Sequence, residues 1–269
     1  MMRLLPDKAV VFNSLVRDEL VEFNEMKEGD ILISGLPQYD YFYSYVPVSK
    51  EEFCQKKNLS PEKEIIVYAS MGRAFSSLDW DMVDFMYELT QSDSLVKKSE
   101  LLVRFQPNDF VDEVELKKRP HLIYDIPGIR FGTKRGVDWD MNENDLNNLA
   151  DTLKNMSVLV CYASSISIDA SVFDKPVINI NFDINPPVSL LKSPTQYYET
   201  LHYKNALRTN AIDLVSSKED LIEKLNNYLN DPSIKIDERK VLIKEQCAFS
   251  DGASGERIAR FMLDLIKHE

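Results

Sequence analysis

The sequence predicts an α/β protein built on a doubly wound, mostly parallel β-sheet. Short apolar runs rich in β-branched residues recur along the chain, and each is too short for a helix and typical of a strand covered on both faces. Segments with apolar residues at helical spacing lie between these runs. Such an alternation of strands and helices indicates a parallel sheet with helices on both faces.

The clearest strand–helix–strand unit spans residues 157–181. Residues 158–161 (VLVC) form one apolar run, and residues 177–180 form another. The segment between them is apolar on most sides, as in a helix packed on a sheet, and Lys175-Pro176 ends it. We expect a right-handed βαβ connection.

The remaining elements follow the same pattern. We expect further strands at residues 9–13, 31–34, 64–69, 101–105, 121–124 and 211–215, and helices at 14–26, 78–91, 144–156, 217–229, 234–246 and 254–267, with another helix starting after Ser49. The six strands between residues 64 and 215 should form one Rossmann-like unit. We therefore expect two parts, residues 1–45 and residues 46–269, with a long functional loop at residues 182–210.

The composition excludes several classes of function. The net charge of −12 argues against general binding to nucleic acid or to an anionic membrane, leaving peripheral association at most. No apolar run approaches 18 residues, and the three widely spaced cysteines fit free thiols in the cytoplasm. The three histidines lack metal-ligand spacing, so no metal or other cofactor is expected. Neither a G-x-G-x-x-G fingerprint nor a P-loop is present.

Two adjacent serines, Ser164 and Ser165, precede the helix of the βαβ unit. A helix N-terminus carries partial positive charge and unpaired N–H groups, so these hydroxyls could help to bind a phosphate. The alternative is that they only cap the helix. Asp169 lies one turn later on the same face, where it could accept hydrogen bonds from sugar hydroxyls or satisfy the nearby turn.

Further candidates lie at or near the carboxyl ends of other strands. Ser70, Gly72 and Arg73 follow the strand at 64–69, and could serve a phosphate or form an exposed loop. Arg104 lies within an apolar run and therefore needs either a carboxylate partner or a bound anion. His202 lies in an aromatic run, where it could contact a sugar or a phosphate or simply be packed or solvated.

Several stretches together resemble the C-terminal, donor-binding half of GT-B type glycosyltransferases of the surface and capsular polysaccharide type, and the related CDP-glycerol glycerophosphotransferases. The motifs are SGLPQYDYF (34–42), LLVRFQPND (101–109), VLVCYASSISIDASVFDKPVI (158–178), ETLHYKNALRT (199–209) and FSDGASGERIARFML (249–263). They cover nearly the full chain, and the Ser-Ser-Ile turn with its following Asp and Lys-Pro is the most specific of them.

The resemblance implies a donor-binding domain of a nucleotide-sugar-dependent transferase in cell-surface polysaccharide biosynthesis. The donor, linked to UDP or CDP, would place its phosphates at Ser164 and Ser165, with Arg104 and Arg73 neutralising charge. Asp169 would recognise hydroxyl groups, and His202 would contact sugar or phosphate. GT-B enzymes usually need no bound metal. The acceptor would be a glycan or a lipid-linked molecule, and the protein would act in the cytoplasm or at the inner face of the membrane.

The sequence departs from the family pattern in two ways. The strand-end motif that usually reads Arg-x-His-Pro has Gln106 in the histidine position, which weakens the glycerophosphotransferase interpretation. The resemblance also begins near the end of the first GT-B domain, so the chain is either a fragment or works with a separate acceptor-domain subunit, and the catalytic base is not identified. The alternatives are a CDP-glycerol-type glycerophosphotransferase, a non-catalytic nucleotide-sugar-binding subunit and, less favoured because no acid/base cluster is evident, a UDP-sugar epimerase.

Overall fold

The computed structural model describes residues 6–186, 189 and 193–267. Contacts divide the chain into a larger unit, residues 47–239, and a smaller unit formed by residues 1–46 and 240–269. The last 30 residues of the chain thus group with the first segment, and the expected division into residues 1–45 and 46–269 stays a prediction. That residues 1–45 are the remnant of another domain remains a prediction.

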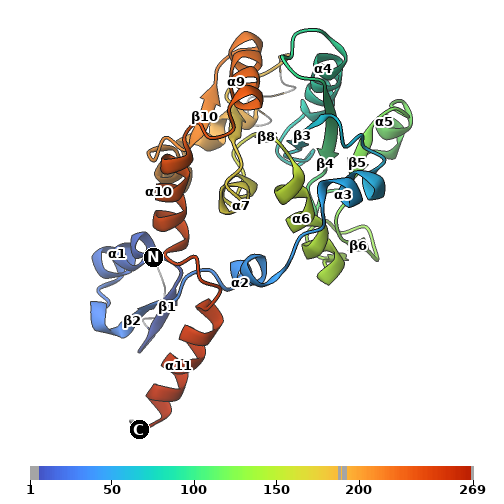
Figure 1. The fold of residues 1–269 in the computed structure, drawn as a ribbon. Helices are drawn as coiled ribbons and strands as arrows, with labels where there is room; N and C mark the ends of the chain where they lie inside the picture. The colour runs from blue at the N-terminus through green and yellow to red at the C-terminus, as the bar shows by residue number, and fades with distance from the viewer. Residues whose placement is uncertain (1–5, 187–188, 190–192, 268–269) are drawn as a thin grey trace. The chain divides into compact units, whose positions relative to one another are not determined.

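The larger unit is built on a six-stranded sheet in which every pair of neighbours is parallel (Figure 1). In spatial order its strands are β10 (Ile212–Val215), β9 (Val177–Ile180), β8 (Val158–Cys161), β3 (Glu64–Ala69), β4 (Ser99–Arg104) and β5 (Ile123–Asp125). The chain therefore winds outward from β3 to β5, returns to the centre at β8, and winds outward again to β10. This order confirms the doubly wound α/β fold.

Helices connect the strands, and their ends follow from local capping. The larger unit contains α3 (Lys50–Lys57), α4 (Asp79–Gln91), α5 (Glu113–Lys117), α6 (Glu143–Asn155), α7 (Ile166–Val172), η3 (Pro194–Glu199), α8 (Leu201–Leu207) and α9 (Lys218–Asn230). The Ser49 hydroxyl accepts a hydrogen bond from the backbone N–H of Glu52 at 3.3 Å, and Ser217 caps α9 in the same way. Helices α4 and α9 share one apolar core with β3, β8 and β9.

Two segments predicted as connectors are helical. The sequence indicates a turn at residues 35–40 and an aromatic-rich connector that runs on to Pro47, but α2 (Pro37–Ser44) occupies much of this stretch and begins with a proline, which is favourable in a first helical turn. The predicted long loop contains η3 and α8, which bring Tyr198 and Tyr203 into the interior. A short antiparallel pair, β6 (Ile129–Arg130) with β7 (Trp139–Asp140), was not predicted.

In the smaller unit, β1 (Ala9–Val11) pairs in parallel with β2 (Ile31–Ile33). Helix α1 (Ser14–Asn24) and the 3-10 turn η1 (Glu28–Asp30) lie between these strands in the chain, and α11 (Ser254–Lys267) ends the described chain. Helix α10 (Ile236–Cys247) crosses the boundary between the units. The carboxylate of Asp40 accepts hydrogen bonds from the backbone N–H groups of Ser254 and Gly255, at 3.0 and 2.8 Å, which joins α2 to the start of α11.

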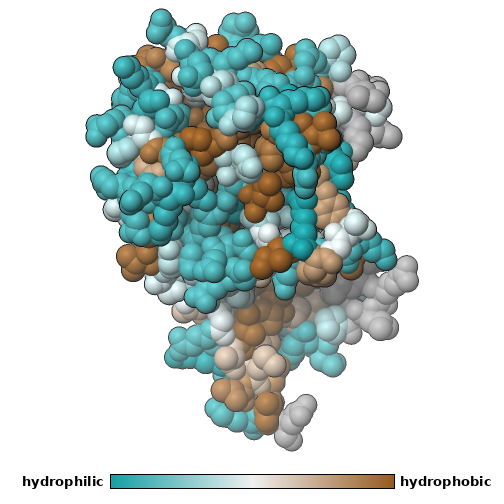
Figure 2. Space-filling view, turned by 90° about the vertical axis from the view of Figure 1, so that its right-hand side faces the viewer, coloured by the Kyte–Doolittle hydropathy of each residue, from teal (hydrophilic) through white to brown (hydrophobic). Residues whose placement is uncertain are grey.

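Apolar side chains remain exposed along α11. Figure 2 shows hydrophobic residues gathered on this helix, which include Met262, Leu263 and Ile266. Of the helices among the described residues, none combines the length and the apolar character needed to cross a bilayer.

Candidate functional site

The strand order creates a natural binding position at the carboxyl edge of the sheet. Strands β3 and β8 are neighbours at the centre of the sheet. From β3 the chain continues to β4 on one side of this pair, and from β8 it continues to β9 on the other side. The loops that follow two such strands diverge and leave a crevice between them, where doubly wound proteins bind their ligands. We call the cavity found here the switch-point pocket.

The switch-point pocket has a volume of about 340 Å³ and is formed by four segments, one of which is Gln106 after β4. Residues that follow β3 and β8 form two of its walls, and a third comes from η3, α8 and the residue between them. The lining residues are Ala69, Ser70, Met71, Phe75, Gln106, Tyr162, Ala163, Ser164, Ser165, Ile168, Tyr197, Thr200, His202, Tyr203 and Ala206. Four of the predicted site residues, Ser70, Ser164, Ser165 and His202, are therefore brought together in one pocket. None of the lining residues is acidic, so an anionic ligand meets no repelling carboxylate at its walls.

The two serines at the start of α7 are not used for capping. Ser165 occupies the capping position, but its side chain makes no cap hydrogen bond. Among the residues that the structure describes, no hydrogen-bond partner is found for the hydroxyl of Ser164 or of Ser165. Both hydroxyls are thus available to a ligand, together with backbone N–H groups of the first turn.

A buried polar network supports the serine turn from behind, and the sequence did not predict it. The Tyr203 hydroxyl bonds to Ser167 Oγ at 3.0 Å and to Asn179 Oδ1 at 2.5 Å, and it also lies 3.5 Å from the carbonyl oxygen of Ser164. Burial raises the pKa of the Tyr203 hydroxyl, so it stays protonated and donates. The network ties α8 to α7 and β9, and it fixes the wall that carries His202.

Tyr162 is a second lining residue that the sequence analysis missed. Its side chain is almost wholly buried, and within the described chain its hydroxyl has no hydrogen-bond partner. Burial raises its pKa, so this hydroxyl also keeps its proton. Its position directly after β8 was the available signal, because residues that end central strands face the crevice.

Arg104 and Asp169 are not among the residues that line the switch-point pocket. Arg104 is 3% exposed and forms a close ion pair with Asp125, so the carboxylate alternative for this buried arginine is the one that the structure contains. Lys57 and Asn148 also contact Asp125, at 3.1 and 2.5 Å. Asp169 is half-buried on α7, and its backbone N–H donates to the carbonyl of Ser165 at 3.2 Å. We therefore assign Arg104 to the structural framework of the domain, where it pairs with Asp125 and does not line the pocket.

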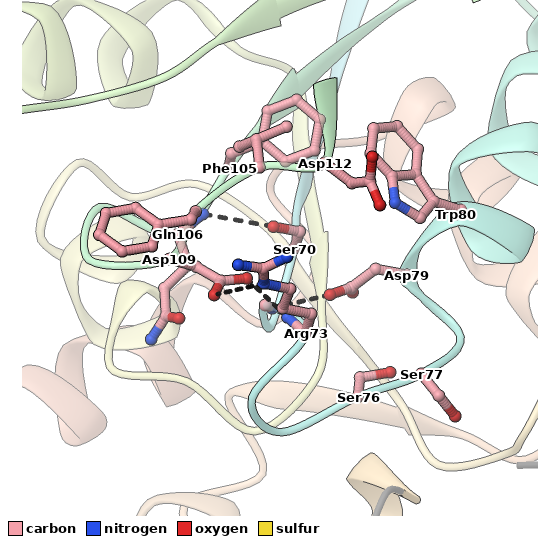
Figure 3. A pocket seen from close by; sticks show the side chains of 13 residues that line it. Ser70, Arg73, Ser76, Ser77, Asp79, Trp80, Phe105, Gln106, Asp109 and Asp112 are labelled. Carbon is pink, nitrogen blue, oxygen red and sulfur yellow. Dashed lines mark hydrogen bonds and ion pairs between the residues drawn. The ribbon is translucent and has the colours of Figure 1, made fainter. Parts of the chain in front are cut away.

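Gly72 and Arg73 line a smaller neighbouring cavity of about 160 Å³, which we call the acidic pocket (Figure 3). Asp79 accepts hydrogen bonds from the N–H of Gly72 at 2.7 Å and from the Tyr68 hydroxyl at 2.8 Å. Asp109 accepts from the N–H of Arg73 at 2.6 Å, and the Arg73 guanidinium lies 3.9 Å from the same carboxyl group. Both carboxylates hold the loop after β3 in place, and they make this pocket unfavourable for a phosphate.

Like Ser70, Gln106 lines both pockets. Its backbone N–H donates to the Ser70 hydroxyl at 3.3 Å, and its side-chain oxygen accepts from Arg135 at 3.2 Å. The Arg135 guanidinium lies 5.0 Å from the ring centre of Phe75, another lining residue of the switch-point pocket. The cationic side chain of Arg135 thus lies beside the switch-point pocket and contacts Gln106, which occupies the position where the resemblance implies a histidine.

Substitution of Gly72 by alanine should destabilise the protein by about 1–3 kcal/mol. Gly72 has φ +87°, and an added Cβ would lie 2.5 Å from the Gln106 side-chain oxygen and 2.8 Å from Asp109 Oδ2. The matched control is Gly29→Ala, because a Cβ at Gly29 would have no atom within 4 Å. Urea unfolding of both variants checks this, and equal midpoints would contradict the strain assigned to Gly72.

Within the described part of the chain, no group of three or more His, Cys, Asp or Glu residues is arranged to hold a metal ion. The cysteines, Cys54, Cys161 and Cys247, are all buried. Hydroxyl groups, backbone N–H groups and one imidazole therefore dominate the chemistry available in the switch-point pocket.

The fold is that of the Rossmann-like domains of GT-B proteins. The family described as CDP-glycerol:poly(glycerophosphate) glycerophosphotransferase matches residues 6–264, and the chain belongs to this family. The match holds although Gln106 replaces the expected histidine. No curated protein sequence matches the chain significantly.

Several solved structures share the fold of this chain at low sequence identity. The wall teichoic acid polymerase TagF is 18% identical, with a TM-score of 0.60 over 97% of this chain and 59% of its own. S. aureus MnaA in complex with UDP is 14% identical, with a TM-score of 0.58 over 98% of this chain and 61% of its own. A UDP-N-acetylglucosamine 2-epimerase is 13% identical, with a TM-score of 0.53 over 98% of this chain and 58% of its own. The chain thus spans about three fifths of the length of these proteins.

Proposed function

We propose that this chain is the donor-binding part of a transferase in cell-surface polymer biosynthesis, and that CDP-glycerol is its first candidate donor. The observation that carries the proposal is the switch-point pocket, where the hydroxyls of Ser164 and Ser165 lie without partners in the described chain and no acidic residue lines the wall. Family membership supports CDP-glycerol, and TagF structures include a variant soaked with CDPG. A UDP- or CDP-linked sugar is the alternative donor.

Each lining group has a role in this proposal. The diphosphate lies against Ser164, Ser165 and the first N–H groups of α7, where partial positive charge and hydroxyl donors stabilise it. His202 contacts the glycerol or sugar, or a phosphate oxygen. Phe75 and Tyr197 meet edge to face, with 5.8 Å between ring centres, and offer an aromatic wall to the nucleoside base.

The reaction that this donor supports is transfer of glycerol phosphate to a hydroxyl group. The acceptor oxygen forms a bond to the phosphorus that carries glycerol, the bond from this phosphorus to CMP breaks, and the hydroxyl proton passes to a base. That base is not assigned to any residue here. We propose a glycan or lipid-linked acceptor, reached at the inner face of the cell membrane, with the acceptor-binding part on another segment or on a separate subunit.

A non-catalytic donor-binding subunit is the second candidate. Gln106 favours it, because an amide cannot take up or release a proton as the expected histidine could. Turnover of CDP-glycerol by this chain alone would reject the second candidate. Recovery of activity only after addition of a separate acceptor-binding protein would support it.

Calorimetric titration tests the donor. CDP-glycerol, CDP, UDP-N-acetylglucosamine and UDP are titrated into the full chain, and we expect CDP-glycerol to bind with a dissociation constant below roughly 1 mM. Tighter binding of the UDP compounds would favour a nucleotide-sugar donor instead. The absence of binding by all four at millimolar concentration would overturn the proposal.

A further inference from the structure

A second large cavity lies at the opposite, amino-terminal edge of the same sheet. It has a volume of about 650 Å³, and we call it the lysine cleft. Glu64 at the start of β3, Ser157 just before β8 and Pro176 just before β9 line it. It shares no lining residue with the switch-point pocket or the acidic pocket.

The lysine cleft is rich in positive charge, although the protein carries a net charge of −12. Its lysines come from four separate segments and are Lys50, Lys97, Lys154 and Lys175. The carboxylates at its walls are already engaged. Asp174 pairs with Arg239 at 2.7 Å, and Glu64 lies 3.5 Å from Lys97 and accepts a hydrogen bond from Ser157 at 2.5 Å.

Two of these lysines have no partner among the residues that the structure describes. No hydrogen bond or ion pair is found there for the ammonium group of Lys154 or of Lys175. Lys175 is half-buried at the wall, and burial, with the nearby charge of Lys154, lowers its pKa although Asp174 and Glu64 partly offset this. An ammonium group that nearby carboxylates compensate only in part is unfavourable in such a position, and a bound anion lowers this cost.

Structural roles account for only part of this arrangement. Lys154 lies in the last turn of α6, where a cation interacts favourably with the helix dipole. Lys50 donates to the carbonyl of Lys63 at 2.9 Å, so it is held in place while its charge stays uncompensated by that contact. Neither contact explains why Lys154 and Lys175 both line one cavity, which is much larger than one water molecule, without partners in the described chain.

We propose that the lysine cleft binds an anion that carries more than one phosphate group, with Lys154 and Lys175 as its principal contacts. Ammonium groups bind phosphate as compact point charges with several donors, and two of them on different segments favour a ligand with more than one charged centre. The site lies at the edge opposite the proposed donor pocket, so this inference does not depend on the proposed function.

Residue-resolved lysine acetylation tests the site in the full chain. Sodium tripolyphosphate is the soluble probe, and vesicles that contain cardiolipin, whose headgroup carries two phosphates, are the lipid probe. We expect tripolyphosphate to slow the acetylation of Lys154 and Lys175 at least fivefold, read by mass spectrometry, and to leave the exposed Lys117 unchanged. Protection by tripolyphosphate alone identifies a free phosphate ligand, whereas protection by vesicles as well identifies a lipid headgroup as a source.

A matched pair of variants gives an independent measurement. In calorimetry, Lys154→Gln with Lys175→Gln should weaken tripolyphosphate binding at least tenfold, whereas Lys117→Gln should leave it unchanged. Binding of CDP-glycerol should not differ between these variants, which separates this inference from the donor proposal. Equal protection of Lys117, or no change in affinity in the double variant, would overturn the inference.

Discussion

Replacement of Asp125 by alanine is expected to destabilise the protein by about 3–5 kcal/mol, the cost of removing one partner of a buried ion pair. Asp125 on β5 forms an ion pair with Arg104, which is 3% exposed. The Asp125 carboxylate also accepts hydrogen bonds from Lys57 at 3.1 Å and from Asn148 at 2.5 Å. Without this carboxylate, Arg104 keeps its charge in a buried position, because guanidinium groups do not lose their proton in proteins. Unfolding in guanidinium chloride or by heat measures the loss.

The control is Asp18→Ala, which removes one of the two carboxylates that pair with Arg17, the other being Glu28, in an ion pair whose carboxylate is largely exposed. Exposed pairs contribute about 0–1 kcal/mol, so this variant should remain close to the parent protein. A double variant, Arg104→Met with Asp125→Leu, should recover part of the lost stability because no charge is left unpaired. If Asp125→Ala proved as stable as Asp18→Ala, the assignment of Arg104 to the framework would be wrong.

The case of Arg104 explains which parts of the site can be predicted from sequence. The apolar run around it predicted strand β4, and the cost of burying a charge predicted that it needs a partner. The partner itself depends on strand register, because β4 and β5 pair so that Arg104 lies directly beside Asp125. A single sequence does not specify that register, so the alternatives of a carboxylate and a bound anion stayed open.

The serines and His202 illustrate the part that sequence does predict. Ser70, Ser164 and Ser165 follow β3 and β8, whose apolar runs are plain in the sequence, and the strand order of a doubly wound sheet brings those two strand ends together. The sequence predicts a loop where the helix that carries His202 lies, because the aromatic run at 197–203 has neither a clear helical stripe nor a side-chain cap at Thr200. Its position depends on Tyr203 reaching Asn179, a contact between segments 24 residues apart.

Replacement of Ser165 by aspartate should weaken donor binding about 100-fold or more while leaving stability unchanged or slightly higher. Ser165 lines the switch-point pocket, is exposed, and lies at the capping position of α7 without a cap hydrogen bond. A carboxylate at this position can cap the helix and interact favourably with the helix dipole, which stabilises the folded protein. A phosphate about 5 Å away is repelled by about 3 kcal/mol per unit charge at an effective dielectric constant near 20, which corresponds to more than 100-fold in affinity.

The matched control for this charge change is Ser94→Asp, at an exposed serine just after α4, outside the residues that line the switch-point pocket. It adds the same charge to the whole protein, so a general electrostatic effect on an anionic donor would appear in both variants. Calorimetry with CDP-glycerol and thermal unfolding are measured on each protein. If Ser165 faces the ligand, Ser165→Asp should lower the affinity for CDP-glycerol while the stability of the fold is unchanged or higher. If Ser165 had only a structural role, the affinity for CDP-glycerol would not fall. If both variants bound CDP-glycerol as the parent does, the diphosphate would have to lie elsewhere, and the paired serines would lose their proposed role.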